Sequence, residues 1–161
     1  MAAVTRFASG AAVKLRSQGS KAGLIQVFAH TSAFRPGPKY SRSVVMPLRR
    51  PTDDTVALVT AAVKGIEAIY RPGFNFAKSG VMLLDLQDGG MHQGELDLEP
   101  EPAERGQLMG TMDKLNDRFG RGTLVLASAG VKGPQRDFEM KQNLLTPRYT
   151  TCWADLPVAK A

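Results

Sequence analysis

The sequence has 161 residues, of which 43% are hydrophobic, which excludes a disordered chain and suits one domain with or without an appendage. A single cysteine, Cys152, excludes an internal disulfide, and no apolar run approaches the roughly 20 residues of a membrane span, so we expect a cytoplasmic protein without a membrane partner. The net charge of +6 is uneven, because residues 1–52 hold nine Lys and Arg and no Asp or Glu, and we expect an anionic partner for that part.

The first third of the chain predicts a helix and two strands. Apolar residues at helical spacing indicate a helix over Val4–Ser17. Strands are expected at Gly23–His30 and Ser41–Leu48, joined by a turn with two prolines and a glycine. Pro47 favours an edge strand or a strand end, because proline has no N–H to donate. The predicted buried face of the helix comprises Val4, Phe7, Ala11 and Leu15.

A second helix and a third strand complete the first predicted domain. Thr52 or Asp53 can cap the helix, which Arg71-Pro72-Gly73 ends. The third strand, Lys78–Leu86, is the most apolar segment. The order α-β-β-α-β predicts an α+β fold: a small open sheet with both helices on one face and the other face free for a ligand. The predicted buried stripe of the second helix comprises Val56, Val59, Val63, Ile66 and Tyr70.

The rest of the chain predicts a linker and a small α/β extension. Residues 79–104 contain seven acids and no base, and Asp88–Glu104 is also rich in Gly and Pro, which indicates an extended linker. A helix is expected over Gln107–Phe119 and a short strand over Thr123–Ala127. We therefore expect a domain at 1–87, a linker at 88–104 and an extension at 105–161. The predicted apolar face of the last helix comprises Leu108, Met112, Leu115 and Phe119.

Catalytic signals are absent from the sequence. His30 and His92 have no Cys, His or Asp at metal-ligand spacing, and structural roles are expected for both. There is no nucleophile elbow, Walker loop or dinucleotide fingerprint. Cys152 lacks a neighbouring base, and Asp85 is the one acid on a predicted strand. We expect no catalytic residue, metal or cofactor in this chain.

Several motifs together resemble one family across almost the whole chain. They are similar to the C-terminal region of the catalytic subunit of bacterial DNA polymerase V, a Y-family translesion polymerase of the UmuC/ImpB/MucB/SamB family. The most specific is Met140–Thr151 followed by Trp153 and Asp155, and Lys78–Leu86 resembles the closing strand of that family's little-finger domain. The other matching segments are His30–Phe34, Pro51–Thr55, Gln107–Met109 with Asp113, Leu115 and Asn116, and Gly120–Leu124.

The resemblance implies a role in DNA repair and the SOS response without catalysis by this chain. The family's palm, fingers and thumb precede the matching region, so no catalytic residue carries over. The first little-finger strand also has no counterpart, which predicts an open sheet edge and a separate C-terminal fragment. The alternatives are the C-terminal part of an intact polymerase and a standalone sliding-clamp adaptor.

The family's little finger places its sheet against primer–template DNA. Phosphate contacts hold DNA without reading its sequence, which suits a lesion-tolerant enzyme. The resemblance and the charges together predict that three arginines, one lysine and two hydroxyl side chains contact the phosphates. These residues are Thr31, Ser32, Lys39, Arg42, Arg49 and Arg50.

The family also carries a sliding-clamp peptide just after this strand. The pattern Gln-x-x-Leu-x-apolar occurs here as Gln93, Leu96 and Leu98, with Leu98 where an aromatic residue is usual. The resemblance therefore implies the sliding clamp as a partner, bound weakly, and also the polymerase V accessory subunit and the recombinase filament. The alternative is that these residues form only an acidic spacer.

Overall fold

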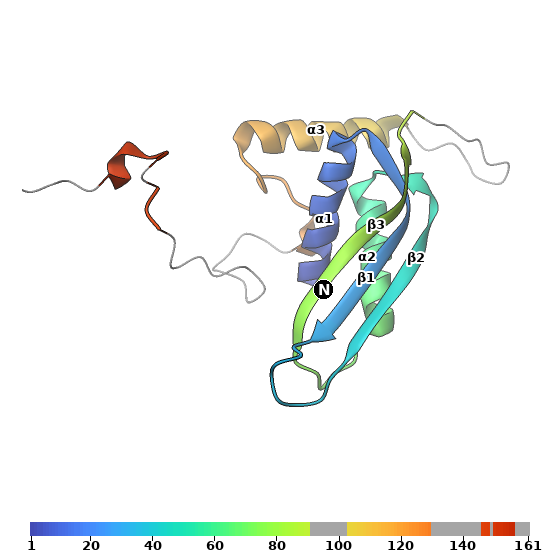
Figure 1. Ribbon diagram of the computed structural model, residues 1–161. Coiled ribbons are helices and arrows are strands. Elements are labelled where there is room, and N and C mark those ends of the chain that lie inside the picture. Colours follow the sequence, from blue (N-terminus) through green and yellow to red (C-terminus); the bar gives the residue numbers. More distant parts are fainter. Residues whose placement is uncertain (91–102, 130–145, 149, 157–161) are drawn as a thin grey trace, which may run out of the picture. The chain divides into compact units, whose positions relative to one another are not determined.

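The computed structural model describes residues 1–90, 103–129, 146–148 and 150–156, and the chain divides into two units, residues 1–131 and 132–161. The expected α+β class is confirmed (Figure 1). The second unit contains the short 3-10 helix η2, Trp153–Asp155. The elements of the first unit are α1 Ala2–Ser17, β1 Ser20–Thr31, β2 Ser41–Thr52, α2 Thr55–Ile69, β3 Phe76–Asp88, α3 Ala103–Phe119 and the 3-10 helix η1 Ala127–Ala129.

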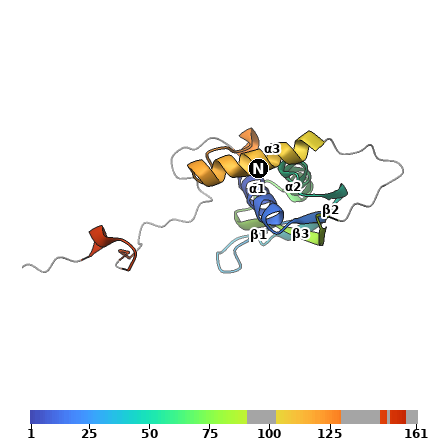
Figure 2. The same cartoon turned by 90° about the horizontal axis from the view of Figure 1, so that it is seen from above.

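The three strands form an antiparallel sheet in the order β2-β1-β3. Val27 of β1 lies opposite Val44 of β2 and Val81 of β3, and all three face the helices. Helices α1 and α2 cover one face, as predicted, and the described residues leave the other face open (Figure 2). Pro47 lies in β2, as predicted for a proline, because β2 is an edge strand of the sheet. An edge strand tolerates a residue that has no backbone N–H to donate.

Small residues bring the helices close to the sheet. A Cβ added to Gly65 of α2 would lie 3.0 Å from Cγ2 of Val27, and Ala8 and Ala62 are fully buried. The expected helix faces were partly wrong, since Phe7 and Tyr70 are 39% and 54% exposed. The contact faces are set by small side chains that permit close approach rather than by the largest apolar ones. The main core cluster comprises Val4, Ala8, Ile25, Val27, Ala29, Val59, Ala62, Ile66 and Ile69.

The N-terminus of α2 is capped by Asp54, so the expected caps Thr52 and Asp53 were wrong. The Asp54 Oδ1 atom accepts a hydrogen bond of 2.8 Å from the N–H of Val56. Strand β2 continues through Thr52, whose hydroxyl accepts from the N–H of Asp54 at 3.1 Å. Because the strand is longer than predicted, the helix begins later, at Thr55.

Helix α3 is tied to the sheet domain by a bidentate ion pair. The Nε and Nη2 atoms of Arg16 donate to the two carboxylate oxygens of Asp113, at 2.6 and 2.9 Å. The third nitrogen, Nη1, donates to the carbonyl of Asp53 at 2.7 Å and to the hydroxyl of Thr55 at 2.9 Å. Arg16 thereby joins the C-terminal turn of α1, the start of α2 and the middle of α3.

The apolar face expected for α3 was partly wrong, since Met112 and Leu115 are half-buried as predicted but Leu108 and Phe119 are not. The strand expected after the helix was wrong. Met109 is the buried residue of the helix, whereas Leu108 and Phe119 are 56% and 62% exposed. No strand occupies the described residues 120–129. The side chain of Asn116 accepts from the N–H of Leu124 at 2.9 Å and donates to its carbonyl at 3.0 Å. These bonds satisfy the backbone groups that a strand would have paired.

Candidate nucleic-acid interface

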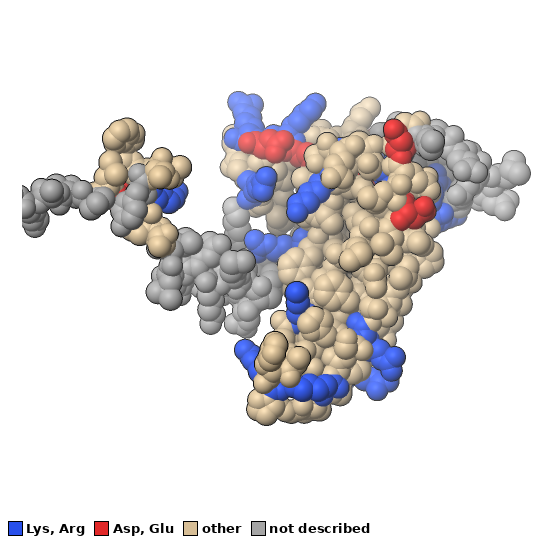
Figure 3. Space-filling model, in the orientation of Figure 1, with Lys and Arg blue, Asp and Glu red and all other residues tan. Residues whose placement is uncertain are grey.

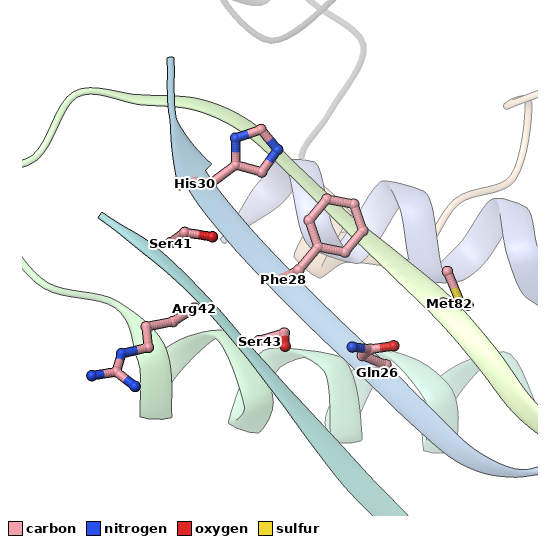
Figure 4. Close-up of a pocket in the computed structure, with 7 residues that line it drawn as sticks. All are labelled: Gln26, Phe28, His30, Ser41, Arg42, Ser43 and Met82. Carbon is pink, nitrogen blue, oxygen red and sulfur yellow. The ribbon is translucent and has the colours of Figure 1, made fainter. Parts of the chain in front are cut away.

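A shallow hollow of about 480 Å³ lies on the open face of the sheet, which α1 and α2 leave uncovered (Figure 4). Its volume falls within the roughly 300–1,000 Å³ that small-molecule sites occupy. Side chains from all three strands form its walls, and none of them is acidic. The lining residues are Gln26, Phe28 and His30 of β1, Ser41, Arg42 and Ser43 of β2, and Met82 of β3.

Two aromatic rings form one wall of the hollow. Phe28 and His30 have centroids 6.2 Å apart and planes inclined by only 15°, so they are nearly parallel. Phe28 lies opposite Gly80 of β3, and a Cβ on Gly80 would come within 2.6 Å of the ring. The glycine therefore lets the Phe28 ring lean across β3, as Figure 4 shows.

Two connections lie at the lower end of the sheet, and we call them the tip. They are residues 32–40 between β1 and β2, and residues 70–75 between α2 and β3. A cluster of aromatic side chains packs between them. The Tyr40 ring lies 4.8 Å from that of Phe74 and 5.8 Å from that of Phe76, between centroids. Its hydroxyl donates to the carbonyl of Ile69 at 2.6 Å, and the Arg71 guanidinium lies over the ring at 5.8 Å. The two connections are therefore held together beside the hollow.

Three of the six residues predicted to contact phosphates are engaged within the tip. The Thr31 hydroxyl accepts from the N–H of Tyr40 at 3.0 Å, which closes the β1–β2 hairpin. The Ser32 hydroxyl accepts from the N–H of Phe34 at 3.3 Å. The Lys39 ammonium donates to the carbonyls of Ser32, at 3.0 Å, and Arg35. Thr31 and Ser32 thus shape the loop, and Lys39 lies at the exposed surface.

The three predicted arginines are divided between the two ends of β2. Arg42 lines the hollow and makes no hydrogen bond or ion pair within the part of the chain that the structure describes. Figure 4 shows its side chain reaching past the free edge of β2. Arg49 is exposed and Arg50 half-buried, about 23 Å farther along the strand at an extended rise of ~3.3 Å per residue. The structure therefore does not unite the six residues in one patch.

The charges of the open face are separated along the strands. In Figure 3, Lys and Arg side chains lie at the lower end of the sheet, the centre of the sheet is largely uncharged, and a second group of Lys and Arg lies at the upper left, over α3 and α1. The acids Asp85 and Asp88 lie at the opposite end of β3, since Asp88 pairs with Ser20 at the start of β1. The basic residues of the tip and the adjoining strand ends are Arg35, Lys39, Arg42, Arg71 and Lys78.

Most residues of the hollow were not predicted from the sequence. Gln26, Phe28 and His30 alternate along β1 with the buried residues Ile25, Val27 and Ala29. This period-2 pattern places the first three on the open face, and it was readable in the sequence. The remaining wall residues were unreadable, because the pairing of β2 and β3 with β1 decides them. The missed wall residues are Gln26, Phe28, His30, Ser41, Ser43 and Met82.

Some predicted features lie outside the described residues. The predicted clamp motif lies outside them, with its residues Gln93, Leu96 and Leu98, and so does His92. Among the residues that are described, no helix is both long and apolar enough to cross a membrane. In the same residues, no cluster of three or more His, Cys, Asp or Glu is placed to hold a metal ion.

Comparisons with known proteins cover both parts of the chain. Residues 1–96 match the impB/mucB/samB family C-terminal domain, and residues 106–159 match a domain of unknown function, DUF4113. Protein UmuC of Salmonella typhimurium is 38% identical over 156 residues, which cover 96% of this chain and 36% of that protein. Protein SamB of Salmonella typhimurium is 39% identical over 160 residues, covering 98% of this chain and 37% of that protein. The chain thus spans little more than a third of the length of these relatives.

Proposed function

The chain belongs to the impB/mucB/samB family, whose C-terminal domain it matches over residues 1–96, and we propose that it is a DNA-binding and partner-docking region of an error-prone translesion DNA polymerase. In this proposal it acts in the bacterial cytoplasm, in DNA repair and the SOS response. It holds primer–template DNA by the phosphate backbone and contributes no catalytic residue.

The observation that carries the proposal is the open sheet face with its basic tip. Arg42 is exposed and without a partner among the described residues, and the nearby Lys39, Arg71 and Lys78 add charge of the same sign. Phosphate oxygens are the natural ligands of such a surface, and neutralising them releases counterions from DNA. Phosphate contacts carry no sequence information, which suits an enzyme that copies damaged templates.

Duplex binding by the whole chain is expected to fall steeply with salt. If about four phosphates are neutralised, the logarithm of the association constant should change with the logarithm of salt concentration at a slope of roughly −3.6. Between about 50 and 200 mM salt this corresponds to an affinity loss on the order of 100-fold. Fluorescence anisotropy with two duplexes of unrelated sequence measures it. A slope near zero, or a strong preference for one duplex, would contradict the proposal.

We further propose that Gln93, Leu96 and Leu98 bind the sliding clamp. The motif follows β3 and precedes α3, so it connects two elements of the first unit. In such a peptide the two leucines would enter an apolar pocket on the clamp, while the glutamine would set the register. A leucine at the last position buries less apolar area than an aromatic ring, which lowers affinity.

Calorimetry against the host clamp is expected to give a dissociation constant on the order of 10 μM to 1 mM. Leu96→Ala with Leu98→Ala should abolish binding, and Leu98→Phe should tighten it, because the larger side chain buries more apolar surface. If the double alanine variant binds as well as the unchanged chain, the segment is only a spacer.

A standalone clamp adaptor is the alternative function, and it would keep full activity after loss of the basic tip residues.

A further inference from the structure

We propose that Phe28 and His30 form a stacking site for an unpaired base of single-stranded DNA. This inference rests on the proposed DNA-binding function and goes beyond phosphate contact, because it assigns a ligand to the hollow itself. The hollow is bounded by two nearly parallel rings, with a guanidinium at its rim and no acid in its walls. Aromatic rings on an exposed sheet face, with cations beside them, suit unpaired nucleotides.

The glycine opposite Phe28 supports a surface role for the ring. A core phenylalanine would point toward α1 and α2, but Phe28 alternates with the buried Val27 and Ala29 and so lies on the open side. It leans across Gly80, where a Cβ would clash with the ring at 2.6 Å. One part of the ring is thereby covered by β3, and the rest remains a wall of the hollow.

The polar groups around the rings fit a nucleotide. Arg42, at the rim, can neutralise a phosphate, and Lys78 lies opposite His30 in the β1–β3 register. Gln26 carries an amide, and Ser41 and Ser43 carry hydroxyls, all of which can donate to or accept from a base edge. The nearest acids of β3, Asp85 and Asp88, lie toward its far end and do not line the hollow. The charge of the site is therefore complementary to an unpaired DNA strand.

The test compares three labelled DNA probes of equal length on the full 161-residue chain. These are single-stranded oligo-dT, the same strand with abasic sites at its centre, and a duplex. The unchanged chain should bind the abasic strand roughly 5- to 100-fold more weakly than oligo-dT, because stacking is lost while the phosphates remain. Phe28→Leu should shift the affinity for oligo-dT toward that for the abasic strand, with the His30 ring retaining part of the difference, and should leave duplex affinity within about twofold.

The chain contains a matched control for the loss of an aromatic ring. Phe119 at the end of α3 is 62% exposed and belongs to neither the hollow nor the tip, so Phe119→Leu removes an equivalent ring elsewhere and should leave oligo-dT binding unchanged. The inference is overturned if the unchanged chain binds oligo-dT and the abasic strand equally. It is also overturned if Phe119→Leu causes the loss instead, or if Phe28→Leu weakens duplex and single strand alike. Failure of the proposed DNA-binding function can be told apart from failure of the stacking site, because salt-dependent duplex binding by the unchanged chain would be missing only in the first case.

Discussion

Removing the exposed arginine of the tip, Arg35, together with the exposed Arg42 at the adjoining end of β2 is expected to weaken duplex binding about 10- to 100-fold at moderate salt. Arg35→Ala with Arg42→Ala takes away two cations from the end of the sheet where positive charge gathers. A hydrogen bond to a charged group contributes about 1.5–3 kcal/mol, and solvent screening lowers the value at an exposed site, so the two contacts together should contribute about 1.4–2.7 kcal/mol. The salt slope should become less steep by about two, one for each lost phosphate contact.

The matched comparison uses the arginines at the other end of β2. Arg49→Ala with Arg50→Ala removes the same charge, about 23 Å away by the rise of an extended strand. If DNA lies over the tip, this variant should lose less than about threefold in affinity. Arg42→Lys should retain the salt slope, because counterion release depends on charge rather than on guanidinium geometry. Equal losses from both arginine pairs would show that the DNA follows the full length of β2.

Local periodicity made the elements of residues 1–90 predictable, and their contact faces only in part. The three strands were each predicted with a core segment that the structure contains, because alternation is a local property of the sequence. Which side of α2 is buried depends on its distance from the sheet, and Gly65 sets that distance through its contact with Val27. Hydrophobicity alone favoured Tyr70, which is 54% exposed.

The candidate site was predictable in its charge and not in its shape. Nine cations without an acid in residues 1–52 directed attention to the β1–β2 region. Whether Arg42 and Arg49 act together depends on the length of β2, which runs five residues beyond Pro47. The Phe28 wall depends on a cross-strand neighbour, Gly80, that is 52 residues away in sequence. Such pairings are fixed by strand register, which no local pattern specifies.

The Arg16–Asp113 ion pair is expected to contribute more to stability than any other ion pair described. The Arg16 side chain is only 10% exposed and that of Asp113 22%, whereas Arg105, which pairs with Asp54 at 3.2 Å, is 45% exposed. Water therefore screens the Arg16 pair less. Removing Asp113 would leave a largely buried guanidinium with two of its hydrogen bonds unmade, and that loss is costly.

A double-mutant cycle measures this contribution separately from changes in helix propensity. Asp113→Ala should lower the free energy of unfolding by about 2–4 kcal/mol, and Arg16→Ala by a similar amount. The double variant should be less destabilised than the sum, giving a coupling of about 2 kcal/mol in urea unfolding. The same cycle on Arg105 and Asp54 should give a coupling below about 1 kcal/mol, because one partner is exposed.

The coupling measured between Arg16 and Asp113 also decides whether the regions covered by the two family matches unfold together. Helix α3 overlaps the match over residues 106–159, yet its ion pair reaches α1, within the match over residues 1–96. A coupling near 2 kcal/mol would mean that α3 unfolds together with the sheet domain, and the Asp113→Ala variant should then show faster proteolysis at α3. If the Arg16 cycle couples no more strongly than the Arg105 cycle, α3 is joined to the domain through the packing of Met109 instead, and Met109→Ala should become the more destabilising change.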